Sequence, residues 1–130
     1  MLLPSWMPID RHRASAHHTP VLLIEVDSYA RLQHEVALRT AGYHVRVLSA
    51  CPGPADLFRA VLVLADVPSF EVLRAQSGPP LPPIVVLSDD DRAGITACLR
   101  GAAAWAPSNG QADYLVDTVD GVLHTRHPPP

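Results

Sequence analysis

Residues 21–27 read Val-Leu-Leu-Ile-Glu-Val-Asp, four apolar side chains in a row followed by a segment with two acidic ones. An unbroken apolar run of this length predicts a strand that is covered on both faces, as in a parallel sheet. Similar runs occupy residues 61–64 (Val-Leu-Val-Leu) and 84–87 (Ile-Val-Val-Leu). Residues 43–48 largely alternate apolar and polar side chains, and residues 103–106 form a short apolar run, so both segments predict further strands.

Helical patterns fill the intervals between these five predicted strands. Strands that alternate with helices predict an α/β domain, a doubly wound (βα)5 parallel sheet with right-handed crossovers. The strand order expected for such a sheet is 2-1-3-4-5. The predicted helices span residues 28–41, 55–59, 70–76, 90–100 and 111–123.

The first of these helices has clear boundary signals. Ser28 is suited to cap its N-terminus, and Gly42 is suited to end it. Leu32, Val36 and Leu38 supply its apolar side chains.

The two ends of the chain differ from this middle part. Residues 1–19 contain two prolines and three histidines without any periodicity, which predicts a flexible N-terminal arm. Residues 20–124 are predicted to form one domain, and residues 125–130 a tail or the start of a linker.

Composition excludes several classes of function. The net charge of -3 gives no basic surface for nucleic acid, and no apolar run reaches the ~20 residues of a membrane span. The two cysteines, Cys51 and Cys98, lack the spacing of a metal or redox site, which favours a cytoplasmic protein with reduced thiols. All ten basic residues are arginine, and with 14 prolines this indicates a GC-rich coding bias, as in actinobacteria.

Four short motifs, taken in order, resemble the receiver domains of two-component response regulators of the NarL/FixJ type. Val21–Asp27 is similar to the strand that carries the acidic pair of that family, and Ala41–Val45 (Ala-Gly-Tyr-His-Val) to the Gly-Tyr-x-Val entry into the second strand. Ile84–Ser88 resembles the strand that ends in Thr or Ser, and Gly101–Trp105 the Gly-Ala-x-x-Tyr segment. The resemblance covers residues 20–123 and implies a flavodoxin/CheY-like fold.

The resemblance also implies a chemical site, and the sequence departs from it. A phosphoryl acceptor of this family needs carboxylates that hold Mg²⁺, a Thr or Ser hydroxyl and a lysine that offsets phosphoryl charge. Glu25 and Val26 stand at the acidic pair, so that valine replaces the second acid. Ser88 retains the hydroxyl, Ser108 falls at the lysine position, and Trp105 stands at the aromatic switch position.

The position of the phosphoacceptor is left open by the sequence. The apolar run 61–64 places it at Ala65, with Asp66 one residue late. One residue along a strand points to the opposite face, so Asp66 is expected to lie off the axis of the site. Pro68 also follows Asp66 too closely for the pattern of the family.

Other groups of polar residues have plain structural explanations. Asp89, Asp90 and Asp91 could form a metal cluster, but acids at a helix start are better explained by capping and by the helix dipole. His12, His17 and His18 lie in the arm without a metal-binding spacing. We therefore expect no metal, no cofactor and no catalytic residue, and hence no enzyme.

These departures predict a phosphorylation-independent pseudo-receiver domain of a transcriptional regulator. It is expected to form a homodimer through its fourth helix, fifth strand and fifth helix (90–100, 103–106 and 111–123), and to control a DNA-binding output domain absent from this chain. The GC-rich bias and the resemblance together favour a regulator of antibiotic biosynthesis. One alternative is a small-molecule sensor of a pathway end product, with an apolar ligand at Val26 and Ala65. The other is a weak phosphoacceptor that uses Asp66.

Overall fold

The sheet lies between two layers of helices. The computed structural model describes residues 19–49, 52–76 and 80–126, and the predicted arm and tail fall almost entirely outside these ranges. All strand pairs are parallel, and the strand order is β2-β1-β3-β4-β5, which confirms the predicted fold. The strands are β1 (Pro20–Ile24), β2 (His44–Leu48), β3 (Leu62–Asp66), β4 (Ile84–Leu87) and β5 (Ala104–Ala106).

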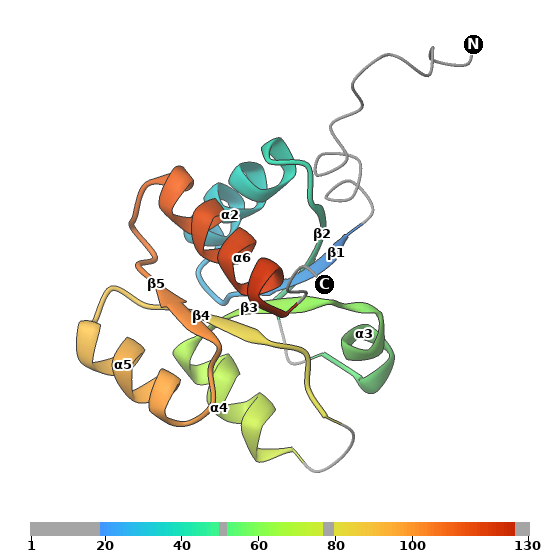
Figure 1. Cartoon of the computed structure of the whole chain (residues 1–130), viewed down its shortest axis with the longest axis vertical. Helices are drawn as coiled ribbons and strands as arrows, with labels where there is room; N and C mark the ends of the chain where they lie inside the picture. Colours follow the sequence, from blue (N-terminus) through green and yellow to red (C-terminus); the bar gives the residue numbers. More distant parts are fainter. Residues whose placement is uncertain (1–18, 50–51, 77–79, 127–130) are drawn as a thin grey trace.

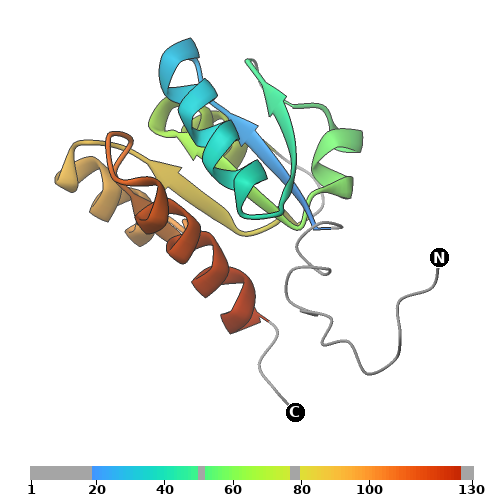
Figure 2. The same ribbon diagram turned by 90° about the horizontal axis from the view of Figure 1, so that it is seen from above.

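The helices divide unequally between the two faces of the sheet. Figure 1 shows α2 and α6 on one face and α3, α4 and α5 on the other, and Figure 2 shows α2 beside α6 from a second direction. Their bounds are α2 (Ser28–Thr40), α3 (Pro54–Arg59), α4 (Val67–Ala75), α5 (Asp91–Leu99) and α6 (Ala112–Arg126). In the described part of the chain, no helix is long and apolar enough to span a membrane.

The apolar runs of the strands supply both cores. Leu23 and Leu64 pack with Leu38 of α2 in the cluster on the α2/α6 side. Ile24 and Ala65 pack with α4 and α5 in the cluster on the opposite side. Because successive side chains of a strand point to opposite faces, a sheet covered on both sides requires unbroken apolar runs.

The start of α2 differs from the prediction. Asp27, not Ser28, is the N-cap, and its Oδ1 accepts hydrogen bonds from the backbone N–H groups of Tyr29 (2.9 Å) and Ala30 (3.1 Å). An ionised carboxylate at this place satisfies two unpaired N–H groups and lies at the positive end of the helix dipole.

The apolar side chains of α2 also do not all enter the core. Leu38 is fully buried, but Leu32 is 58% exposed and Val36 is 55% exposed. The buried polar residue of this helix is His34. The face of α2 that meets the sheet is thus rotated away from two of its three predicted apolar residues.

The helix after β3 begins earlier than the sequence indicated. It was predicted at residues 70–76, but α4 starts at Val67, directly after β3. Asp66 is its N-cap and Pro68 stands in its first turn, where a missing N–H costs nothing.

Candidate functional site

The polar residues at the carboxyl ends of the strands form the candidate site. In the β1–β3 pair, Ile24 lies opposite Ala65. The next residues along the two strands, Glu25 and Asp66, therefore leave the sheet side by side. Ligands of doubly wound sheets bind at this edge.

The residue of β3 that contributes a side chain to this edge is Asp66, not Ala65. Ala65 is completely buried in the core on the α4 side. Asp66 Oδ2 accepts a hydrogen bond from the backbone N–H of Val26 (3.0 Å), and its Oδ1 accepts one from Ser69 (2.9 Å). Both of its oxygens are used: one binds the β1–α2 loop, and the other caps α4.

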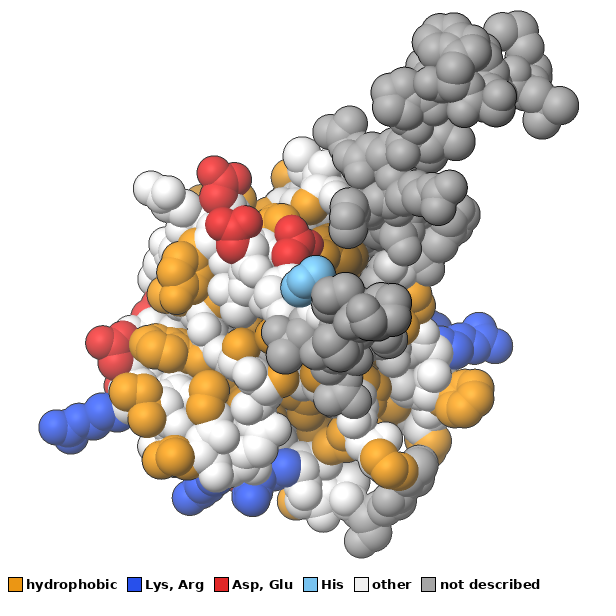
Figure 3. All heavy atoms as spheres, viewed as in Figure 1, with side chains coloured by type: hydrophobic (Ala, Val, Ile, Leu, Met, Phe, Trp, Pro, Cys, Tyr) orange, Lys and Arg blue, Asp and Glu red, His pale blue; other side chains and the backbone are white. Residues whose placement is uncertain are grey.

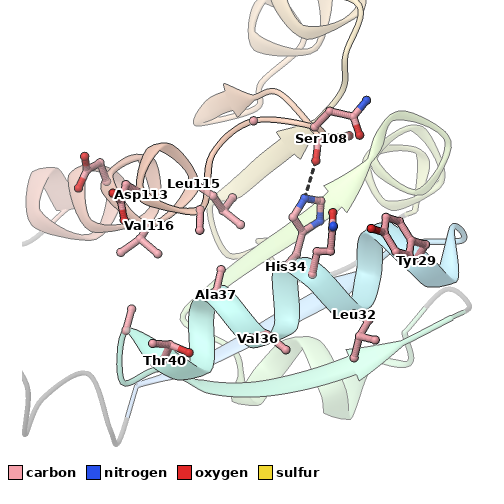
Figure 4. Close-up of a pocket in the computed structure, with 16 residues that line it drawn as sticks. Tyr29, Leu32, His34, Val36, Ala37, Thr40, Ser108, Asp113, Leu115 and Val116 are labelled. Carbon is pink, nitrogen blue, oxygen red and sulfur yellow. Dashed lines mark hydrogen bonds between the residues drawn. The ribbon is translucent and has the colours of Figure 1, made fainter.

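Glu25 is bound to a histidine that sequence reasoning did not single out. Its Oε2 lies 2.7 Å from Nδ1 of His34, and the two side chains are 4% and 6% exposed. The other ring nitrogen of His34, Nε2, lies 2.9 Å from the backbone oxygen of Ser108 (Figure 4). Arg31 donates to the backbone oxygen of Glu25 at 2.9 Å. His34 thus joins the end of β1 to the β5–α6 loop.

The hydrogen bonds of His34 imply a positive charge. A carboxylate and a backbone carbonyl only accept hydrogen bonds, so both ring nitrogens must donate when Glu25 is ionised. Burial alone lowers the pKa of His34. The hydrogen bond and charge of Glu25, the carbonyl of Ser108 and the charge of Asp89 outweigh burial and raise this pKa above its ordinary value. Ser108, at the predicted lysine position, therefore contributes a backbone acceptor for a cation that comes from α2.

The protonated state of His34 should make stability depend on pH. Because the pKa is raised in the folded state, the stabilisation is complete below the unfolded-state value of about 6.5 and is lost as pH rises through the folded-state pKa. We expect the free energy of unfolding from urea titrations to decrease as pH rises above about 6.5 in the native chain, and to decrease less in His34→Gln. Parallel pH profiles for the two proteins would show that His34 does not titrate as described.

Trp105 and Ser88 connect β4 with β5. The indole N–H of Trp105 donates to the backbone oxygen of Ser88 at 3.0 Å, and the ring lies against Gly94 of α5. The Ser88 hydroxyl accepts from the backbone N–H of Asp90 at 3.1 Å. The hydroxyl that the resemblance implies for phosphoryl chemistry is thus used in a local turn.

The consecutive acids 89–91 do not act as one group, because Asp89 and Asp90 make separate structural contacts. Asp89 accepts two hydrogen bonds from Asn109. Its Oδ1 lies 2.8 Å from the backbone N of Asn109, and its Oδ2 lies 2.5 Å from Nδ2 of the same residue. Asp90 is the N-cap of α5. Among the described residues, no three His, Cys, Asp or Glu side chains are grouped to hold a metal ion.

Among the comparisons with known proteins, only the comparison of structures finds similar proteins. No family profile and no curated protein matches the sequence. Among solved structures, a response regulator receiver protein from Burkholderia phymatum is 23% identical, with a TM-score of 0.66 over 81% of this chain and 94% of that chain. A receiver domain from Bermanella marisrubri is 18% identical, with a TM-score of 0.65 over 80% and 97%. The chemotaxis response regulator CheY4 of Vibrio cholerae is 21% identical, with a TM-score of 0.59 over 80% and 98%. The chain therefore has the CheY-like fold of response regulator receiver domains.

Proposed function

We propose that this chain is a receiver-type signalling domain whose state is set without phosphorylation. One observation carries the proposal: both acids at the strand ends are bound by groups of the chain itself. Asp66 accepts from Val26 and Ser69, and Glu25 is paired with His34 in a site closed to solvent. The oxygen of Asp66 that attacked a phosphoryl group would have to give up or weaken its own hydrogen bond, either the one from Val26 or the one from Ser69.

The residues at this edge do not fit a magnesium ion. Mg²⁺ requires near-octahedral oxygen ligands, including carboxylates that are free to reach it. Val26 supplies no ligand, and Glu25 and Asp66 are occupied as described.

The absence of a phosphate response gives the first test of the proposal. We expect Mg²⁺, alone or with beryllofluoride, to leave the amide resonances of residues 25–27 and of Asp66, Val67 and Ser69 unchanged, and light scattering to give an unchanged mass. The reason is that neither carboxylate is available to the metal or to the phosphoryl analogue. Saturable shifts at Val26 and Asp66 at millimolar Mg²⁺ would argue for an intact receiver site.

The signalling role follows the resemblance. We propose a cytoplasmic transcriptional regulator of the NarL/FixJ type, with a role in antibiotic biosynthesis and a DNA-binding domain outside this chain. Its homodimer would use α5, β5 and α6. Ile95 and Leu99 support this face, because they are 54% and 83% exposed on α5. Large exposed apolar side chains that neighbour one another are typical of interaction surfaces.

A weak phosphoacceptor is the second candidate. It is favoured by the position of Asp66 beside Glu25 at the carboxyl ends of β1 and β3. A sensor with an apolar ligand at Val26 and Ala65 has less support, because Ala65 is completely buried and Val26 is 68% exposed.

A further inference from the structure

A groove runs between α2 and α6, and one end of it adjoins the candidate site at His34 and Ser108. Its volume is about 1030 Å³, and it extends from Tyr29 and Ser108 at one end to Thr40 and Ala41 at the other. Figure 4 shows the two helices on either side of it, with Leu115 of α6 directed toward α2. The α2 side is about 18 Å long over these residues, at 1.5 Å per residue.

The α2 wall of the groove is an unused apolar stripe. Tyr29, Leu32 and Val36 are 72%, 58% and 55% exposed, and all three line the groove. Their spacing of three and four residues places them on one side of the helix. Leu38 already packs α2 against the core. A second apolar side of the same helix adds to stability only when another segment covers it.

The α6 wall of the groove is acidic. Asp113 and Asp117 line it, and neither carboxylate has an ion-pair partner among the described residues. Figure 3 shows acidic side chains gathered over α6, which also contains Asp120. Within the described ranges of the chain, no arginine lines the groove. Its occupant should therefore combine apolar side chains with positive charge.

The N-terminal arm of the same chain (residues 1–18) has this composition. Its apolar part is followed, after the single acidic residue Asp10, by a basic part that contains Arg11 and Arg13. The large apolar residues of the arm are Met1, Leu2, Leu3, Trp6, Met7 and Ile9.

The arm joins the domain at the correct end of the groove. The backbone oxygen of Thr19 accepts a hydrogen bond from His44 (3.1 Å), just after the turn that follows α2. Thr40 and Ala41, at the end of α2, line the near end of the groove. Eighteen residues reach up to ~60 Å when extended, about three times the length of the groove.

We propose that the N-terminal arm of this chain binds in its own α2–α6 groove. Its apolar side chains cover Leu32 and Val36, and its arginines pair with Asp113 and Asp117.

Trp6 permits a test in the full chain. Its emission is obtained as the difference between the spectra of the native chain and of Trp6→Phe, which leaves Trp105 in place. We expect this emission at a shorter wavelength than that of N-acetyltryptophanamide. It should move to the wavelength of that reference in Leu32→Glu/Val36→Glu, and partly so in Asp113→Asn/Asp117→Asn. Raising the salt concentration to 1 M should produce a similar partial shift, because it screens exposed charges.

Val72→Glu is the matched control, because Val72 is 49% exposed on α4, on the opposite face of the sheet. It should leave the emission of Trp6 unchanged, and circular dichroism verifies the fold of each variant. Emission of Trp6 at the reference wavelength in the native chain would overturn the proposal. So would a short-wavelength emission that persists in Leu32→Glu/Val36→Glu. A short-wavelength emission that is lost on dilution would instead place the arm in the groove of a second copy.

Discussion

Replacing Glu25 or His34 alone by leucine should destabilise the domain by about 3–5 kcal/mol, because each change leaves one buried charge or hydrogen-bonding group without its partner. The pair is almost fully buried, and His34 also holds the backbone oxygen of Ser108. The double variant Glu25→Leu/His34→Leu should regain most of this loss, because two apolar side chains replace the two polar groups together. Urea denaturation of the four proteins gives the coupling free energy.

An exposed ion pair on the same helix provides the control. Oε2 of Glu35 lies 2.9 Å from Nε of Arg39 on α2, and the two side chains are 27% and 54% exposed. Glu35→Gln should cost at most about 0.5 kcal/mol, because solvent screens such pairs. A Glu25→Leu variant no less stable than Glu35→Gln would contradict the role assigned to the buried pair.

Gly94→Ala should be the most damaging single methyl addition in the described helices. The new Cβ would lie 2.3 Å from atoms of the Trp105 ring, which is rigid and is held by its hydrogen bond to Ser88. We expect a loss of about 1–3 kcal/mol from overpacking and a change in Trp105 fluorescence, as the ring is displaced.

Gly121→Ala tests the same substitution at a helix position where the new Cβ has no steric clash. In α6, a Cβ at this position meets nothing within 4 Å. Alanine should therefore stabilise the domain by up to about 1 kcal/mol, the usual difference in helix propensity. Equal effects of the two substitutions would show that contact with Trp105 does not restrict position 94.

The strands could be predicted because the cause of their pattern is local. The runs 21–24, 61–64 and 84–87 are apolar at every position, and all of these residues are buried except Val61, which precedes β3 and is 39% exposed. The alternation of strands and helices predicted a parallel sheet, and the strand order was expected from the flavodoxin/CheY-like fold that the resemblance implies. The boundary of α4 was missed because Asp66 is at once the last residue of β3 and the helix cap.

The partners at the site could not be predicted, because they depend on how α2 is rotated. His34 lies nine residues after Glu25, and nothing in that spacing distinguishes it from a surface histidine. Only its position at the centre of α2 on the sheet side, a polar residue one turn before Leu38, could have drawn attention to it. Counting along β3 could not settle whether Ala65 or Asp66 meets Glu25, since that depends on the register with β1.

Intact-mass spectrometry after incubation with acetyl phosphate and Mg²⁺ tests the central claim most directly. A receiver domain that accepts phosphate from the same donor serves as the positive control. We predict no adduct on this chain, because Asp66 is engaged by Val26 and Ser69 and the metal ligands are incomplete. Loss of one preorganised electrostatic group typically lowers a rate by ~10²–10³, and here several are missing. An adduct of about 80 Da, the mass of an added phosphoryl group, that disappears in Asp66→Asn would contradict the account.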